Sequence, residues 1–273
     1  MSISEVNKVL VSIVMPSYNS GAFIEESIAS VIKQTVSNWE LLIVDDCSTD
    51  NTFEIISPYL SKYCNIKYFR LEKNSGTAVA RSNAIMKAAG KYIAFLDSDD
   101  VWMPEKLEKQ ISFMKRTNSL FCCTAYAQMD EYGKSKNLVC IPPKMTDYKK
   151  MLRLSDPIGN LTVMYDQSAL GKYQVPNIRK RNDFALWLHI LRDVPYCAGM
   201  SEVLATYRVR MDSVSSNKLA QAKYHWQLYR EIEKLSIIDS CWAMICWAWV
   251  KGTGIGLTRI TKKQNHVRCK RKS

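Results

Sequence analysis

The chain has 273 residues, 47% hydrophobic and 23% charged, so it can bury a sizeable core and global disorder is excluded. Its 38 Lys and Arg outnumber 26 Asp and Glu, and the net charge of +12 points to a polyanionic partner: nucleic acid, an anionic membrane or a phosphorylated substrate. The nine cysteines contain no CxxC pair and no secretory signal precedes the first strand, so a reducing cytoplasm is expected rather than a disulfide framework or a zinc site.

The first hundred residues alternate between short apolar runs and helical stretches. Strands are predicted over residues 9–15, 40–46, 66–70 and 92–96, and helices over 21–36, 50–62 and 77–89. Strand and helix alternating at these lengths predict a parallel sheet with right-handed crossovers.

The second half is less regular. A helix is predicted over 105–116 and a strand over 120–129, followed by a break at 141–144. Further strands are expected over 161–166 and 202–210, with a helix over 183–192 between them. No linker or repeat separates the halves, so one continuous domain is favoured over two.

The last part of the chain combines tryptophan with basic charge. A helix is predicted over 217–235, and the Trp-rich segment that follows contains Asp239, Lys251 and three glycines. It therefore lacks the roughly 20 clean apolar residues of a membrane-spanning helix, and an interfacial helix fits better. From Lys251 to Ser273 there are eight Lys or Arg and no acid, which indicates either a solvated tail or one attracted to an anionic surface.

Polar residues follow three of the predicted parallel strands: residues 16–19, 45–46 and 97–100. Each group alone is typical of a surface turn. Because the carboxyl ends of parallel strands meet at one edge of a sheet, the three together indicate a ligand site. Asp97 and Asp99 can present oxygen atoms to a hard divalent cation that keeps positions open for phosphate, so Mn²⁺ or Mg²⁺ is expected.

Four motifs, VSIVMPSYN (11–19), ELLIVDDCSTDNT (40–52), NSGTAVARSNAI (74–85) and FLDSDD (95–100), resemble the successive motifs of family 2 glycosyltransferases. The resemblance runs from about Val9 to Ser216 and is strongest to bacterial enzymes that build teichuronic acid, O-antigen and capsule. It implies the α/β GT-A fold, a single Rossmann-like, mostly parallel sheet flanked by helices. Residues 1–216 would form the catalytic domain (nucleotide-sugar half about 9–103, acceptor half about 104–216), and 217–273 a helical, Trp-rich and basic extension.

The resemblance also implies an activity. A metal-dependent, inverting enzyme would move a hexose or N-acetylhexosamine from a UDP-sugar to a sugar on a polyprenyl-diphosphate-linked acceptor in surface polysaccharide assembly. Glucose, galactose and an N-acetylhexosamine stay open as the transferred sugar. The enzyme would be cytoplasmic and held at the anionic inner face of the cell membrane. It would have no nucleic-acid partner, and it could form a homodimer.

Site residues are implied position by position. The family's general base matches Asp183, where Asn182 stands in place of the commoner Glu or Gln; without the resemblance, Asp183 would be interpreted as a helix N-cap. Asp99 and Asp97 match the metal ligands. The donor-binding positions match Pro16, Tyr18, Asn19, Asp45, Asp46, Gly76, Arg81, Asp97 and Ser98.

Two other classes of function fit parts of the sequence. Trp and Tyr interspersed with Lys and Arg near the end are typical of a nucleic-acid-binding module, but acids at the strand ends would repel phosphate unless a metal were bound. A catalytically inactive scaffold would share the fold, although Asp46, Asp99 and Asp183 are all present.

Overall fold

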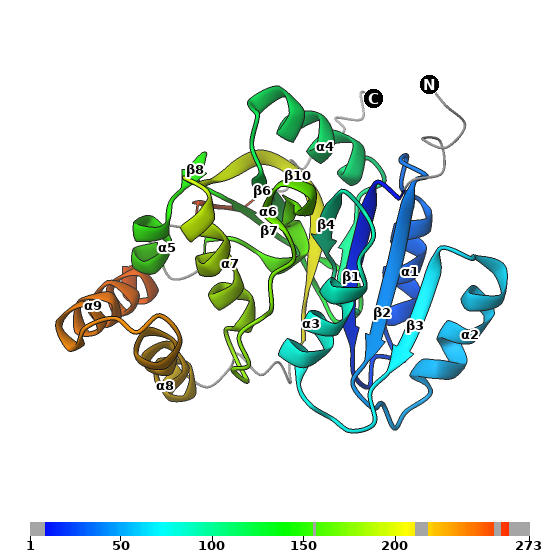
Figure 1. The fold of residues 1–273 in the computed structure, drawn as a ribbon, viewed down its shortest axis with the longest axis horizontal. Helices are drawn as coiled ribbons and strands as arrows, with labels where there is room; N and C mark the ends of the chain where they lie inside the picture. Colours follow the sequence, from blue (N-terminus) through cyan, green and yellow to red (C-terminus); the bar gives the residue numbers. More distant parts are fainter. Residues whose placement is uncertain (1–8, 155–156, 211–217, 254–257, 262–273) are drawn as a thin grey trace, which may run out of the picture.

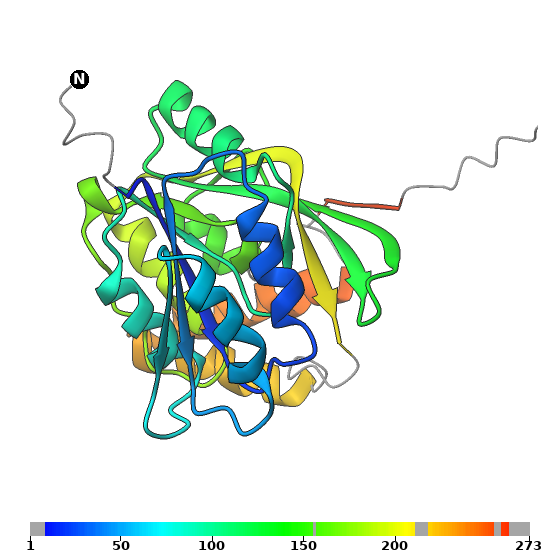
Figure 2. The same cartoon turned by 90° about the vertical axis from the view of Figure 1, so that its right-hand side faces the viewer.

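The structure is a computed structural model that describes residues 9–154, 157–210, 218–253 and 258–261. A central mixed sheet is flanked by helices on both faces (Figures 1 and 2). One apolar core lies between the sheet and helices α1, α2 and α4, and a second lies between the opposite face and helices α3 and α7. The α/β class expected from the sequence is confirmed.

Four parallel strands form the N-terminal half of the sheet in the order β3-β2-β1-β4. They are β1 (Val11–Ser17), β2 (Trp39–Asp45), β3 (Ile66–Arg70) and β4 (Tyr92–Phe95). Every residue of β1, β2 and β4 is buried, which explains their nearly continuous apolar sequence. The crossovers are α1 (Ile24–Ile32), α2 (Thr52–Lys62) and α3 (Thr77–Lys87).

The second half of the sheet is mixed, with one parallel pair among antiparallel ones, so the parallel arrangement is uninterrupted only over β1 to β4. Strand β9 (Met164–Asp166) pairs antiparallel with β4 and with β6 (Phe121–Asp130), and β7 (Ser135–Ile141) pairs antiparallel with β6. The reason is local: β6 and β7 are joined by a four-residue turn, which permits only an antiparallel pair.

Strand β10 (Cys197–Val209) connects the two halves of the fold. It pairs parallel with β6 and antiparallel with β5 (Val101–Trp102) and β8 (Met145–Thr146). Its last residues therefore lie beside the segment that follows β4. Helix α4 (Lys106–Thr117) connects β5 to β6, and the short 3-10 helix η1 (Asn160–Thr162) precedes β9.

Helix α7 (Asn182–Asp193) packs against the face of the sheet that α3 also covers. Trp187 is fully buried, with its ring edge-on to Phe95 at 5.0 Å between centroids and 5.8 Å from Phe121. This burial fixes α7 on the sheet. The short helices α5 (Tyr148–Leu154) and α6 (Gln167–Leu170) complete this half of the molecule.

The C-terminal helices pack against the rest of the protein. Helix α8 (Lys218–Gln227) passes through one π-helical turn (Leu228–Ile232) into α9 (Ile237–Thr253), and α9 contacts α8 and α5. Strand β11 (Thr258–Thr261) then pairs antiparallel with β7 at the edge of the sheet. Among the described helices, none combines the length and the apolar character needed to cross a membrane.

Candidate active site

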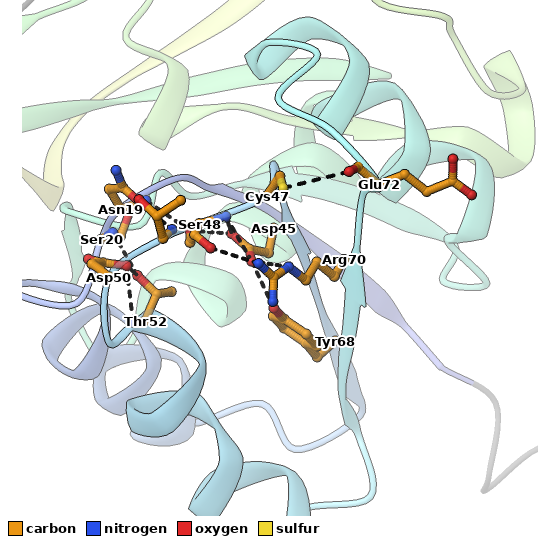
Figure 3. Close-up of polar contacts among 11 residues, drawn as sticks. Asn19, Ser20, Asp45, Cys47, Ser48, Asp50, Thr52, Tyr68, Arg70 and Glu72 are labelled. Carbon is orange, nitrogen blue, oxygen red and sulfur yellow. Dashed lines mark hydrogen bonds and ion pairs between the residues drawn. The ribbon is translucent and has the colours of Figure 1, made fainter.

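The polar segments after β1 and β2 lie together at the carboxyl edge of the sheet (Figure 3). Asp45, the last residue of β2, is 1% exposed; its carboxylate accepts hydrogen bonds from the backbone N–H and the hydroxyl of Ser48 and from the Tyr68 hydroxyl at 2.8 Å. Asn19 holds the other side of this turn, because its backbone N–H donates to Ser48 Oγ at 2.9 Å and its Oδ1 accepts from the Thr49 N–H at 2.8 Å. Asp45 and Asn19 thus shape the turn.

Asp46 connects this turn to the start of α3. Its two carboxylate oxygens accept from the backbone N–H groups of Ser75 at 2.6 Å and Gly76 at 2.7 Å. Gly76 has φ +93°, a left-handed conformation that favours glycine and lets its N–H face the carboxylate. A pocket of about 380 Å³ opens here, between residues 74–78 and residues 177–179, and includes Arg179. Both predicted halves of the chain contribute to it.

Arg81 links the two halves directly. It is 3% exposed, and its guanidinium donates to Asp97 Oδ1 at 2.9 Å and to Asn182 Oδ1 at the start of α7. Asn160 Nδ2 donates to the second Asp97 oxygen at 2.9 Å. Asp97 is thereby held between an arginine and an amide, and the first turn of α7 is tied to α3. The Arg81 Nε and Asn160 Oδ1 atoms are buried and have no hydrogen-bond partner among the described residues.

The other residues of the segment after β4 also face polar partners. Ser98 and Ser20 share a hydrogen bond at 2.7 Å between their hydroxyls, which joins this segment to the loop after β1. Asp99 forms an ion pair with Arg210, at 3.6 Å between Oδ2 and Nη1. Burial and, next, the charge of Asp97 raise the pKa of Asp99, while Arg210 opposes the rise.

Arg208 organises the end of this segment from within the protein. It is 3% exposed, its Nε donates to the Asp99 carbonyl at 2.9 Å, and its backbone N–H donates to Asp100 Oδ1 at 2.8 Å. The same guanidinium forms an ion pair with Glu26 on α1. Burial and then the charges of Asp99 and Asp97 raise the pKa of Asp100 well above its usual value, while its contact with Arg208 opposes the rise.

Asp183, in the first turn of α7, directly follows Asn182, whose Oδ1 accepts a hydrogen bond from the same Arg81 guanidinium that pairs with Asp97. Burial raises the pKa of the Tyr207 hydroxyl, and the negative charges of the three acids of 97–100 and of Asp183 add to the rise. Asp183 is partly exposed, and its Oδ1 accepts from the Phe184 N–H at 2.8 Å. The structure therefore brings together an accessible carboxylate from the second half and the acidic edge of the first.

The remaining expected site residues lie along the same edge. Pro16 is buried in β1 opposite Val44, whereas Tyr18 is 47% exposed just beyond the strand. The sequence does not indicate that the side chains of Asn160, Arg208 and Arg210 lie against the acids, nor that Asn182 contacts Arg81. No local signal identifies them, because the partners named above are 63 to 182 residues away in the chain.

Among the described residues, no three His, Cys, Asp or Glu side chains converge on one point, so a cation at this edge would have at most two protein carboxylates, for which Asp97 and Asp99 are the candidates. Both are partly exposed, at 31% and 25% of their side chains. Mg²⁺ is commonly held by one or two carboxylates together with substrate phosphates, so the pair fits a cation that a diphosphate completes. Burial and, next, the charge of Asp97 raise the pKa of Asp99, and a bound cation would oppose that rise.

Comparison with known proteins points to one family. A sequence model described as Glycosyl transferase family 2 matches residues 12–201. The putative teichuronic acid biosynthesis glycosyltransferase TuaG of Bacillus subtilis is 44% identical over 241 residues, 88% of this chain and 95% of that protein. A second relative is WfgD of Escherichia coli, a UDP-Glc:alpha-D-GlcNAc-diphosphoundecaprenol beta-1,3-glucosyltransferase. It is 42% identical over 221 residues, which cover 80% of this chain and 85% of WfgD.

Solved structures agree on the fold. Residues 1–349 of S. aureus TarS in complex with UDP superpose with a TM-score of 0.63 at 20% identity, covering 86% of this chain and 69% of that one. The mannosyltransferase PcManGT from Pyrobaculum calidifontis, in complex with GDP-Man and Mn²⁺, gives a TM-score of 0.61 at 16% identity, covering 89% and 75%. At these identities the likeness supports the shared fold.

Proposed function

Because the chain belongs to glycosyltransferase family 2, we propose that it transfers a hexose or N-acetylhexosamine, with inversion, from a UDP-sugar to a sugar on a polyprenyl-diphosphate-linked acceptor during bacterial surface polysaccharide assembly. The observation that carries the proposal is the contact made by Arg81: its guanidinium pairs with Asp97 and donates to Asn182, the residue beside Asp183, and so joins the acids that follow β4 to the start of α7. The names of two relatives, at 42% and 35% identity, specify UDP-Glc and a GlcNAc-diphosphoundecaprenol acceptor, so UDP-glucose is the first donor to test.

The donor nucleotide is proposed to bind along the edge formed by the loops after β1 and β2 and by the start of α3. Tyr18 is the exposed aromatic side chain there, and Asp46 fixes the backbone of Ser75 and Gly76 beside it. The diphosphate would then lie toward Asp97 and Asp99, within reach of Arg81 and Arg210. These cationic side chains also supply counter-charge for Asp97 and Asp99, in addition to any bound metal.

Asp183 is proposed as the general base that takes the proton of the acceptor hydroxyl while that oxygen attacks the anomeric carbon. The bond from that carbon to the diphosphate breaks on the opposite face, and UDP leaves with the bonding electron pair, so the anomeric configuration inverts. Arg81 acts through Asn182 and Asp97: it sets the distance between the helix that carries the base and the carboxylates that face the donor.

Mn²⁺ or Mg²⁺ is proposed to be held by Asp99 and Asp97 and by the diphosphate, where it would neutralise the charge that develops on the leaving group. Asp97 keeps its orientation through Arg81 and Asn160, and Asp99 through its backbone contact with Arg208. We further propose that residues 1–216 are the catalytic domain, that 217–273 are an accessory extension, and that the enzyme acts at the inner face of the cell membrane, where the lipid-linked acceptor lies.

The test uses purified full-length protein, Mn²⁺, a GlcNAc-diphospholipid acceptor and a panel of UDP-glucose, UDP-galactose and UDP-N-acetylglucosamine. We expect a β-linked product from one of the α-linked donors, identified by mass spectrometry and NMR. Asp183→Asn should lower turnover by about 10²- to 10⁴-fold, because the base is lost, while UDP affinity changes little. An α-linked product, or full turnover by Asp183→Asn, would refute the mechanism; Asp193→Asn, at the far end of α7, is the matched control.

A further inference from the structure

Helix α9 carries a stripe of large apolar side chains on its outer face. Ile238, Trp242, Ile245 and Trp249 are 81%, 59%, 59% and 65% exposed. They stand at i, i+4, i+7 and i+11, which places them within about 60° of one another around an α-helix. At about 200 Å² for a fully exposed side chain, the four present on the order of 500 Å² of mostly apolar surface, near the upper end for the largest patch on a soluble monomer.

The opposite face of α9 is the one that packs on the protein. Ser240 and Ala243 are 0% and 5% exposed, and the Trp247 ring lies 5.1 Å from the ring of His225 on α8. Trp247 therefore turns inward, whereas Trp242 and Trp249 turn outward. Helix α9 contacts the protein through Ser240, Ala243 and Trp247 and presents the four large apolar side chains of the stripe on its outer face.

Charge decides which partner suits this face. The only charged residue between 237 and 250 is Asp239, which accepts a hydrogen bond from Ser236 at the start of the helix. The 23 residues from 251 onward contain eight Lys or Arg and no acid, and the whole chain carries +12. A second copy would bring the same positive charge against this one, whereas an anionic surface is complementary to it.

We infer that the stripe of Ile238, Trp242, Ile245 and Trp249 is the surface with which the protein lies on an anionic bilayer, with the two outward tryptophans at the level of the lipid headgroups. The inference deepens the proposed function, from which it takes the lipid-linked acceptor. It concerns a face of the helix rather than a spanning segment, in agreement with the length and composition of α9.

Helix α9 is connected to the catalytic region through Glu233. Glu233, 6% exposed in the turn before α9, accepts hydrogen bonds from Arg192 on α7 at 2.7 Å and from the Tyr148 hydroxyl on α5 at 2.5 Å. Since α7 also carries Asp183 at its other end, contact between α9 and the bilayer would fix the orientation of the proposed base relative to the membrane.

Vesicle binding without substrate tests the surface separately from the activity. Full-length protein is mixed with phosphatidylcholine vesicles containing no or 30% phosphatidylglycerol and separated by flotation. Binding should require the anionic lipid, and Trp242→Ser/Trp249→Ser should reduce the partition coefficient roughly 10-fold or more, because two interfacial side chains are lost. Phe53→Ser is the control: Phe53 is 44% exposed on α2, at the other end of the molecule (Figure 1), and its loss should leave binding unchanged.

Cysteine labelling of the unmodified protein gives a second measurement that does not depend on the folding of a variant. Cys241 is exposed beside the stripe, and Cys64 is exposed between α2 and β3. With anionic vesicles present, a charged maleimide should label Cys241 at least about 5-fold more slowly while Cys64 stays unchanged, read by peptide mass spectrometry.

Two results would overturn the inference. One is equal labelling of Cys241 with and without vesicles together with equal flotation of the tryptophan variant. The other is protection of Cys241 in vesicle-free solution that is lost when a dimer dissociates on dilution, since this would make the stripe a contact between copies. Neither outcome bears on sugar transfer to a short-chain acceptor, so the proposed function would stand or fall by its own test.

Discussion

Lys106, the first residue of α4, is an ammonium group placed in the apolar core, and its replacement by methionine should stabilise the protein. The side chain is fully buried; Nζ donates to the neutral amide oxygen of Gln110 at 2.7 Å and lies 4.1 Å from the centroid of the Trp102 ring. Burial lowers the pKa of Lys106 from 10.5 to about 7. Above pH 10.5 the Lys106 amine is neutral in the folded and in the unfolded protein. Between pH 10.5 and 7 only the unfolded chain gains the proton, so the free energy of unfolding falls as the pH falls. Below pH 7 both states are protonated and the free energy of unfolding falls no further on this account.

A shift of about 3.5 pH units at 1.36 kcal/mol each sets an upper limit near 5 kcal/mol. The Trp102 ring favours the ammonium by up to about 2 kcal/mol, so we expect Lys106→Met, which keeps the length of the side chain, to gain roughly 3 kcal/mol at pH 7. The gain should shrink to less than about 1 kcal/mol at pH 10, where the unfolded chain also begins to lose the proton.

Urea denaturation followed by circular dichroism at pH 7, 8, 9 and 10 measures both effects. Lys115→Met, at an exposed position of the same helix, is the control and should leave the free energy of unfolding nearly constant across the series. A gain for Lys106→Met that does not vary with pH would refute the linkage to protonation. A loss of stability would show that the contacts with Gln110 and Trp102 outweigh burial of the charge.

Three further changes follow from the site and its supports. Asp99→Asn should weaken Mn²⁺ binding in the presence of UDP by at least about 10-fold in calorimetric titration, because one of two anionic ligands is lost; unchanged affinity would contradict the metal site. Asn182→Ala should lower the free energy of unfolding by about 1.5–3 kcal/mol, since the charged donor Arg81 loses an acceptor. Asn182→Asp keeps an acceptor oxygen and should retain most of the wild-type stability. Equal losses for the two variants in chemical denaturation would disprove the role of this contact. Glu233→Gln should lower the melting temperature by several degrees in a thermal shift assay, because the buried partner of Arg192 loses its charge; an unchanged value would argue against the bridge.

Much of the N-terminal half could be predicted because its signals are local. Buried parallel strands form short apolar runs between turn residues, and the expected strands overlap β1 to β4 (Val11–Ser17, Trp39–Asp45, Ile66–Arg70 and Tyr92–Phe95). Helix α7 was also anticipated from its apolar spacing. The hairpin strand β7 was missed, since its exposed residues Ser135 to Asn137 show no alternation that would distinguish a strand from a loop.

The acids of the site could be located from the sequence, but their partners could not. Residue types that suit a cation stand out after a strand, whereas a buried arginine such as Arg208 is recognised only when its contacts with Glu26 and the Asp99 carbonyl are seen. The cation expected at these acids was therefore predicted without Arg81 and Arg210, which also neutralise them. Local chemistry predicts that a charge needs a partner, and only the folded chain shows which partner it has.

The pairing of β11 with β7 also bears on how the protein can be handled. An open strand edge offers backbone N–H and C=O groups to any other extended chain and is a common origin of aggregation. Residues 258–261 pair with Leu138 to Ile141 of β7, so the four-residue strand β11 takes the edge position in place of β7. A fragment that ends before Thr258 would leave β7 exposed, and it should form intermolecular sheets on concentration. Crystallisation trials are therefore best made on protein that extends through Thr261. If shorter fragments are insoluble, the exposed edge of β7 is the expected cause.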